Sequence, residues 1–445
     1  MRRRSAEEAP RSYGSLAIDL QAGNNKAKLT NHRNAKCVGL VAALILLGSQ
    51  VRHKFQNRIC MNDQNENENK DFAISQAKNR RRFISYMSSE WEQLWLDNVA
   101  EWGRDPPTGN ICGNIQGPAQ QMFLYRFLSE TCTAKVETSP WCYVNDAYKP
   151  YWYNTVTHQF SLNYPGQDDR VAPIHYYKNV TLGVVPDFNP ENDKIFSRFT
   201  FYDEVEKKKY AEYIEPLVSH LRHPLAGCVN ASHFVEPWSH ETDRLLVFAR
   251  SYLLWLPKPF SSKESEYYYF DAGASSWTSG AGGASLSVLI SQFGKNNIHF
   301  DHVEAWEGTN PEATFYKDVP NEYRERVQYH QAWVSSNPNS TDPAKPFIPN
   351  VIANITKTDD YVFFKLDIDS LGIETGVVDF YLSNEGIDHV QHVDEFAWEH
   401  HVRGNYIMAR RGWCPGACDR SKSLKQSYEY FLSLRKKGIR AHSWV

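Results

Sequence analysis

The segment YYYFDAGASSWTSGAGG, residues 267–283, constrains the fold more than any other part of the chain. Its apolar and aromatic start, 267–270, predicts a buried strand, and an apolar run at 286–293 predicts a helix after it. Between them lie Asp271 and a glycine-rich loop. A strand that enters such a loop and then a helix is typical of nucleotide pockets in open α/β sheets, because glycine lets the backbone turn sharply and lets a ligand approach it closely.

The rest of the C-terminal half repeats this alternation of strand and helix, which favours a Rossmann-like, mostly parallel sheet of the α/β class. Strands are expected at 266–271, 298–306, about 329–335, 361–368, 393–398 and 405–410. Helices are expected near 284–293, 346–356, 372–382 and 422–437, before a final extended piece at 439–445. Ligands of such sheets bind outside the carboxyl ends of the strands. The residues that follow the predicted strands are therefore the candidate site.

Acidic residues stand at the ends of two of these strands. The second strand carries Glu304 and Glu307, and alternation along a strand places their carboxylates on opposite faces. One of the two is expected to accept hydrogen bonds from ribose hydroxyls. The strand at 361–368 ends in Asp367 and Asp369, which are spaced by one residue. These carboxylates are expected to face a ligand.

A carboxylate and two imidazoles, Glu399-His400-His401, follow the strand at 393–398. An acid beside histidine is the usual material for proton transfer near neutral pH. A general base is therefore expected among Asp369, Glu399, His400 and His401, with Asp369 and His400 preferred. The alternative is that these side chains only cap the strand and pair with neighbouring positive charges.

Taken in order, these segments resemble the FkbM-type methyltransferases, a branch of the S-adenosylmethionine-dependent class I methyltransferases. The resemblance covers roughly residues 265–415. Four stretches carry it: Asp271-Ala-Gly273-Ala-Ser275, Ala305-Trp306-Glu307, Phe364-Lys365-Leu366-Asp367-Ile368-Asp369 and Phe396 to His400. Asp369 stands where the family usually has Glu, and the Gly and Glu that follow that motif are displaced to Gly372 and Glu374.

The resemblance implies a class I methyltransferase fold, S-adenosylmethionine as cofactor, and a sugar or other small hydroxyl compound as methyl acceptor. It selects Glu307 over Glu304 as the ribose-binding acid, and no metal is expected. The cofactor-binding residues that it implies are Asp271, Gly273, Ser275, Gly280, Gly282, Glu307 and Asp367.

The N-terminal part predicts attachment to a membrane. An apolar run at 37–51 follows a basic, polar stretch at 1–36 that is expected to be disordered. The run is short for a membrane span, but its long basic leader argues against a cleaved signal peptide. A signal anchor is therefore expected, with 1–36 cytoplasmic, a polar stem at 52–82 and the remainder in the Golgi or ER lumen. A plastid-targeting leader stays open as an alternative.

Sequons and cysteines fit a luminal position. The sequons begin at Asn179, Asn230, Asn339 and Asn354. Several of the cysteines that follow the predicted anchor are expected to pair in an oxidising lumen, in a connectivity that the sequence leaves open.

Residues 83–262 form an aromatic-rich region that is expected to be mainly helical and to bind or cover the substrate, ahead of the methyltransferase-like domain at 263–445. Helices are expected there at 83–102, 203–222 and 241–256. The formal net charge of the chain is −3 and no long basic block occurs in the folded part, which excludes nucleic acid as a main partner.

Two rival functions remain open from the sequence. Asp367-Ile-Asp369 also fits a luminal glycosyltransferase that holds a nucleotide-sugar diphosphate through a divalent metal. The chain could also be a non-catalytic binding module built on the same fold.

Overall fold

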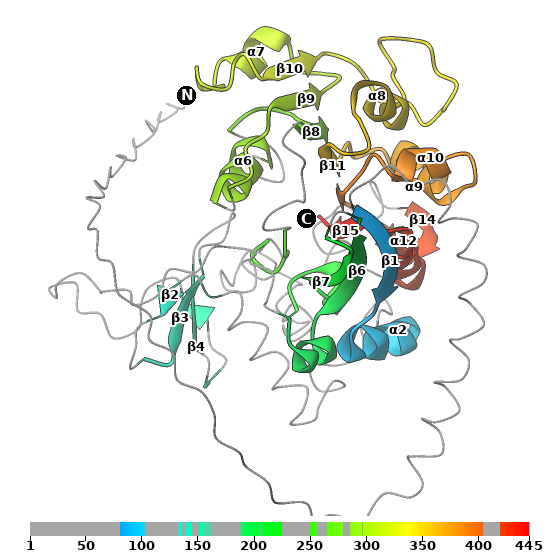
Figure 1. The fold of residues 1–445 in the computed structure, drawn as a ribbon. Coiled ribbons are helices and arrows are strands. Elements are labelled where there is room, and N and C mark those ends of the chain that lie inside the picture. The colour runs from blue at the N-terminus through cyan, green and yellow to red at the C-terminus, as the bar shows by residue number, and fades with distance from the viewer. Residues whose placement is uncertain are drawn as a thin grey trace, which may run out of the picture. The chain divides into compact units, whose positions relative to one another are not determined.

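A parallel sheet forms the centre of the C-terminal half (Figure 1). Its strands in the described part of the chain are β8 (Tyr267–Ala272), β9 (His302–Trp306), β10 (Val327–His330), β11 (Tyr361–Leu366), β12 (Glu395–Trp398) and β15 (Arg440–Ser443). They are arranged in the order β10-β9-β8-β11-β12-β15, and every neighbouring pair is parallel. Counted along the chain this is the order 3-2-1-4-5-6, which is that of doubly wound nucleotide-binding folds.

The structure is a computed structural model, and it describes only part of the chain. The described residues are 81–102, 188–204, 206–224, 250–255, 265–278, 285–295, 297–403 and 419–444, with short pieces between 132 and 161. All of them belong to one compact unit, Asp71–Val445. The expected strand at 405–410 lies outside these residues, as does the expected anchor at 37–51. Among the described residues no helix is long and apolar enough to cross a membrane.

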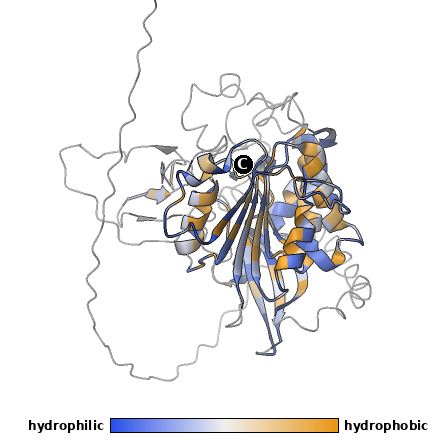
Figure 2. Cartoon of the chain, turned by 90° about the horizontal axis from the view of Figure 1, so that it is seen from above, coloured by the Kyte–Doolittle hydropathy of each residue, from blue (hydrophilic) through white to orange (hydrophobic). Residues whose placement is uncertain are grey.

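Helices follow the strands in turn and cover both faces of the sheet (Figure 2). They are α6 (Ser285–Lys295), α7 (Glu312–Tyr316), α8 (Ile348–Ile355), α9 (Leu371–Leu382), α10 (Ile387–Val390) and α12 (Leu424–Lys436). Two further strands, β13 (Val402–Arg403) and β14 (Asp419–Ser423), pair with each other. The expected α/β class and parallel sheet are confirmed, because strands buried on both faces need helices on both sides.

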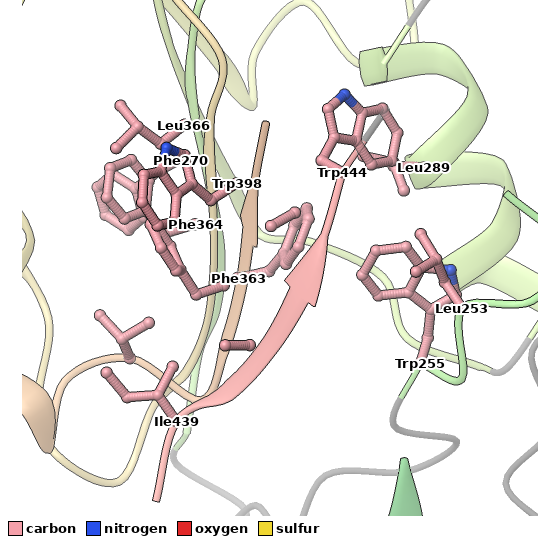
Figure 3. Close-up of a cluster of buried hydrophobic side chains, with 14 of the residues drawn as sticks. Leu253, Trp255, Phe270, Leu289, Phe363, Phe364, Leu366, Trp398, Ile439 and Trp444 are labelled. Carbon is pink, nitrogen blue, oxygen red and sulfur yellow. The ribbon is translucent and has the colours of Figure 1, made fainter. Parts of the chain in front are cut away.

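Side chains of the central strands alternate between two cores. Phe270, Phe364, Leu366 and Trp398 gather in one group in Figure 3, apart from Trp255 and Leu253. Trp398 packs against Phe431 of α12, with ring centroids 5.3 Å apart. Phe363, one residue from Phe364, instead meets Trp255 at 5.5 Å. Successive strand residues point to opposite faces, so one core lies toward α12 and the other toward α6 and Trp255.

The region 83–262 is not mainly helical where it is described, which corrects the expectation. Its helix α2 (Glu90–Trp102) lies within the expected range 83–102, but most of the other described elements of this region are strands of two sheets. An antiparallel sheet joins β1 (Arg81–Met87), β6 (Ser197–Asp203) and β7 (Lys208–Ile214), with short helices η2 (Pro190–Lys194) and η3 (Ser219–Leu221) beside it. A small sheet joins β2 (Ala134–Lys135), β3 (Trp141–Val144), β4 (Tyr151–Asn154) and β5 (Phe160–Ser161).

The segment 203–222 was expected to be a helix, but it forms the strand β7 and the 3-10 helix η3. Its Glu and Lys residues favour a helix, but Lys207 adopts a φ of 53°, and the chain reverses there between β6 and β7. The β6 strand alternates buried and half-buried residues, with Phe199 and Phe201 in a common cluster with Ile214. Packing of this apolar face overrides local propensity. Residues 250–255 of the third expected helix are not helical either, and 241–249 lie outside the described residues.

Buried ion pairs join this upstream region to the parallel sheet. Arg435 of α12 pairs with Glu92 at 3.1 Å and with Glu215 at 3.0 Å. Arg440 of β15 lies 3.6 Å from Glu212 of β7, and it also pairs with Glu395 of β12 within the parallel sheet at 2.9 Å. A disulfide links Cys132 and Cys142 elsewhere in the upstream region. That bond agrees with the expectation that some of the cysteines pair.

Candidate functional site

The site lies where the strand order reverses, between β8 and β11. The chain runs outward from β8 to β10, returns to β11 beside β8, and then runs outward to β15. Lys365 of β11 stands opposite Asp271 of β8 in the register. The Lys365 Nζ lies 3.1 Å from Asp271 Oδ1 and 3.1 Å from Asp367 Oδ2. The two acids that the sequence placed at separate strand ends are thus joined by one ammonium group.

The carboxylate of Asp271 is engaged by this ion pair with Lys365. Its side chain has no exposed surface, and it also accepts a hydrogen bond from the Tyr269 hydroxyl at 2.7 Å. Burial opposes the charge on Lys365, but the two carboxylates raise its pKa above the ordinary value. Asp271 therefore holds the strand ends together through Lys365. The sequence had assigned it to direct contact with a ligand.

Gly273 is required for a different reason from the one expected. Its φ is +101°, and a Cβ built on it would lie 1.6 Å from the carbonyl oxygen of Asp367. Its N–H and that of Ala274 both donate to the Trp306 carbonyl. The missing side chain lets the turns after β8 and β11 touch, so this glycine makes room for the backbone of the neighbouring turn.

The two acids at the end of β9 have different partners. Glu304 lies 2.6 Å from Nε2 of His330 on β10, so its carboxylate is engaged within the sheet. Glu307 follows β9 and is half-buried, and its Oε1 accepts hydrogen bonds from the Thr309 amide at 2.7 Å and the Thr309 hydroxyl at 2.5 Å. Glu307 therefore stands at the carboxyl edge, as expected.

The remaining cofactor-side residues are only partly described. The Ser275 carbonyl accepts a hydrogen bond from Asn310 Nδ2 at 2.5 Å, which ties the loop after β8 to the loop after β9. Gly280 and Gly282 lie outside the described residues. Trp277 of the loop after β8 and Trp306 of the Ala305-Trp306-Glu307 stretch are buried in the core.

A second group gathers at the ends of β11 and β12. Oε1 of Glu399 lies 3.0 Å from Nε2 of His401, and Nδ1 of His401 lies 4.0 Å from Asp369 Oδ1. Glu399 and His401 are buried, whereas the Asp369 side chain is 66% exposed. We call Asp369, Glu399 and His401 the edge triad.

Burial and mutual charge set the protonation of this group. Burial raises the pKa of Glu399, and the nearby Asp367 carboxylate raises it further. Burial also works against ionisation of Asp367, but the Lys365 ammonium lowers its pKa below the ordinary value. Burial disfavours a charged His401, yet the Glu399 carboxylate raises its pKa above the ordinary range. The edge triad can therefore hold or pass on a proton.

His400 does not join the edge triad. Its ring stacks on Trp398 at 4.0 Å, and its Nδ1 lies 2.9 Å from the Ser427 hydroxyl of α12. Burial lowers the pKa of His400 to about 3, so it is neutral near pH 7. Adjacent residues of an extended chain point to opposite faces, and His400 shares the face of Trp398 while Glu399 and His401 share the other.

Arg222 and Trp444 reach the site from distant parts of the sequence and were missed. The Trp444 indole N–H donates to Asp367 Oδ2 at 3.2 Å. Arg222 donates to the Trp444 carbonyl at 2.7 Å, and its Nη2 lies 4.0 Å from Glu399 Oε1. Both residues are buried. No sequence motif marks them, because only tertiary packing brings the end of the chain and the turn after η3 to this edge.

Glu374 holds the backbone of the loop that carries Asp369. Its Oε1 accepts the amides of Ile368 at 3.0 Å and Ser370 at 3.3 Å, and its Oε2 accepts the Trp398 indole N–H at 3.2 Å. Burial raises the pKa of Glu374 to about 8. Asp369 between these amides adopts a φ of 53°. Glu374 follows the stretch Phe364 to Asp369 closely in the sequence, and this position could have marked it as a positioning residue.

The arrangement offers a half-buried carboxylate after β9, a tightly joined strand edge, and an edge triad able to take a proton or to bind a cation. No protein-family model, curated protein or solved structure matches this chain.

Proposed function

We propose that this chain is an S-adenosylmethionine-dependent O-methyltransferase that acts on a sugar or another hydroxyl acceptor. The observation that carries the proposal is the meeting of the carboxyl ends of β8, β9 and β11 at the reversal of strand order, with Glu307 immediately after β9. Nucleotide ligands of open α/β sheets bind at that place, and an acid after the second strand binds ribose.

The cofactor side of the proposed site is built from backbone and one carboxylate. Glu307 would accept hydrogen bonds from the ribose hydroxyls, because its described hydrogen bonds stay within its own loop. The turn at Gly273–Ser275 would face the amino-acid end, together with the loop that contains Gly280 and Gly282. Asp271 and Asp367 act as positioning residues through Lys365. A half-buried carboxylate beside these turns would suit the ribose hydroxyls of an adenosyl group.

The acceptor side is the edge triad. When bound, the cofactor supplies an electrophilic methyl group, whose bond to sulfur breaks with the electron pair remaining on sulfur. The acceptor oxygen forms the new bond to that carbon, and its proton passes to the edge triad. Asp369 is the exposed member and therefore meets the acceptor first. Holding the acceptor oxygen in line at about 3 Å supplies much of the rate.

The rival glycosyltransferase is less well supported. It needs Asp367 and Asp369 together on one metal, but Asp367 is held by Lys365 at 3.1 Å and by Trp444 at 3.2 Å. The exposed Asp369 lies instead beside His401. A nucleotide-diphosphate site built on the Asp-x-Asp pair would first have to break those contacts.

We also propose that the enzyme faces the lumen of the secretory pathway, anchored by 37–51, where glycans supply hydroxyl acceptors. The Cys132–Cys142 disulfide supports an oxidising compartment. Asn339 and Asn354 of two sequons are exposed. Endoglycosidase treatment of the expressed full chain should increase its gel mobility. An unchanged mobility in secretory-pathway fractions, or import into a plastid, would contradict this localisation.

The test of the methyltransferase is calorimetry on the full chain with S-adenosylhomocysteine. We expect binding that weakens at least about tenfold in Glu307→Gln, because hydrogen bonds to a charged group are lost. Glu304→Gln is the matched control on the same strand, and its affinity should stay within twofold of wild type.

Two other outcomes of the binding measurements would contradict the proposal. If the chain bound a nucleoside diphosphate with Mn²⁺ but not S-adenosylhomocysteine, the glycosyltransferase would replace it. If neither ligand bound, the fold would serve as a binding module.

A further inference from the structure

The edge triad has the composition of a metal site. Asp369, Glu399 and His401 each offer one donor atom, and these atoms all lie within 4.8 Å of one another. The donors come from the loops that follow two adjacent strands, β11 and β12. Two of the three side chains are buried and the third is exposed, so one side of the group is open to solvent.

The distances suit coordination. Two ligands at right angles on a cation, each about 2.1 Å from it, are separated by about 3.0 Å. Glu399 Oε1 and His401 Nε2 are 3.0 Å apart. The Asp369 carboxylate lies on an exposed loop, and one of its oxygens is within 4.8 Å of the donor atoms of the other two residues, so rotation of this exposed side chain would bring it into coordination distance.

A buried oxygen points to the same site independently. Glu399 is 6% exposed, and its Oε1 makes no well-aligned hydrogen bond within the described part of the chain, although the ring nitrogen Nε2 of His401 lies 3.0 Å away. The same oxygen is 4.0 Å from the Arg222 guanidinium, beyond hydrogen-bonding distance. A buried carboxylate oxygen without a hydrogen bond is costly, and a bound cation removes that cost.

We propose that Asp369, Glu399 and His401 bind a divalent cation of the Mn²⁺ type. One imidazole nitrogen and two carboxylate oxygens suit a first-row divalent ion better than Ca²⁺, which prefers oxygen ligands alone. Three protein ligands leave further positions for water or for a hydroxyl of the acceptor. Asp367 is excluded from the set because Lys365 and Trp444 hold its carboxylate.

The role of the cation rests on the proposed methyl transfer. With the cation bound, the edge triad serves as its ligands and no longer takes the proton itself. An acceptor hydroxyl bound to the cation then loses its proton to solvent more readily, as metal-bound water does. The oxygen then forms its bond to the methyl carbon while the electron pair of the broken carbon–sulfur bond stays on sulfur. The cation also fixes the position of the acceptor at the exposed side of the edge triad.

Binding of Mn²⁺ to the metal-free full chain tests the site directly, by the loss of the free-ion signal in electron paramagnetic resonance. We expect wild type to bind about one ion, and Asp369→Asn and His401→Asn to bind it at least about tenfold more weakly. Two matched controls should bind as wild type does. Asp388→Asn removes another exposed acid, and His400→Asn removes the neighbouring imidazole that faces α12.

Thermal unfolding shows whether each variant is folded, and Asp369→Asn keeps the test decisive because that exposed side chain is not part of the core. Absence of Mn²⁺ binding by wild type, or equal losses in His400→Asn and His401→Asn, would overturn the metal site. S-adenosylhomocysteine binding is measured in parallel with and without chelator. If it persists while Mn²⁺ does not bind, only the metal site fails. If Mn²⁺ binds and S-adenosylhomocysteine does not, only the methyltransferase fails.

Discussion

Two groups of buried charges lie on this fold, and they are built in opposite ways. The first, which we call the anchoring network, joins the upstream region to β12 and β15 and consists of Glu92, Glu212, Glu215, Glu395, Arg435, Arg440 and His442. The second is the edge triad with its neighbours Asp367 and Glu374. In the anchoring network each acid lies within ion-pair distance of a base. At the edge, the buried Glu374 has no base within ion-pair distance among the described residues, and the exposed Asp369 has only His401, at 4.0 Å.

The protonation of one glutamate from each group shows the difference. Burial opposes the charge on Glu395, but His442 and Arg440 lower its pKa to about 2. Burial raises the pKa of Glu374 to about 8, and the Asp367 carboxylate adds to the rise. Removing one partner of a buried charge pair destabilises a structure, whereas groups with strongly shifted pKa values are more often found at functional sites. The comparison supports a structural role for the first group and a chemical role for the second.

The largest expected effect is in the anchoring network. Arg435→Met leaves the buried carboxylates of Glu92 and Glu215 without their shared partner, so the free energy of unfolding should fall by about 3–5 kcal/mol. Denaturant unfolding of the full chain measures it. Lys425→Met, which breaks an exposed pair with Glu429 on the same helix, is the control and should cost less than about 1 kcal/mol. A similar loss in both variants would remove the distinction between buried and exposed pairs.

A smaller effect is expected at the edge, where close backbone packing matters more than charge. Gly273→Ala places a Cβ against the Asp367 carbonyl at a residue with a left-handed backbone conformation. The free energy of unfolding should fall by at least about 1–2 kcal/mol, and binding of S-adenosylhomocysteine should be lost. Gly372→Ala is the matched control, because a Cβ there meets nothing within 4 Å in a helix. It should stabilise the chain by about 0.5–1 kcal/mol. A neutral Gly273→Ala would mean that the two turns do not need to touch.

The smallest effect concerns the dependence of stability on pH. In the folded chain the pKa of Glu374 is raised from its ordinary value of 4.5 to about 8. The protonated side chain therefore contributes fully to the free energy of unfolding below pH 4.5, and this contribution is lost as the pH rises to about 8. Denaturant midpoints of wild type and Glu374→Gln should therefore converge, or change order in favour of the variant, between pH 5 and about 8. A constant difference over that window would show that Glu374 is ionised throughout.

Much of the fold follows from local patterns in the sequence. The alternation of apolar strands and helices after residue 266 predicted the strands β8 to β12 and the helices α6, α8 and α9, because each of these segments is long enough to show its own periodicity. The short helices α7 and α10 were not predicted. The same reasoning failed at 203–222, where Glu and Lys favour a helix locally but Phe199, Phe201 and Ile214 bury a common face as strands. Contacts between distant segments decided that case.

The candidate site shows the same difference between local sequence patterns and contacts of distant segments. By itself the sequence determined which acids end which strands, since parallel strands of a doubly wound sheet bring Asp271, Glu307 and Asp367 to one edge. Only the tertiary structure decided that Lys365 binds two of them, that Arg222 and Trp444 arrive from far along the chain, and that His401 faces the edge while His400 faces α12. The physical reason is range: strand order and alternation act over a few residues, whereas the pairing of buried charges depends on which segments pack together in space.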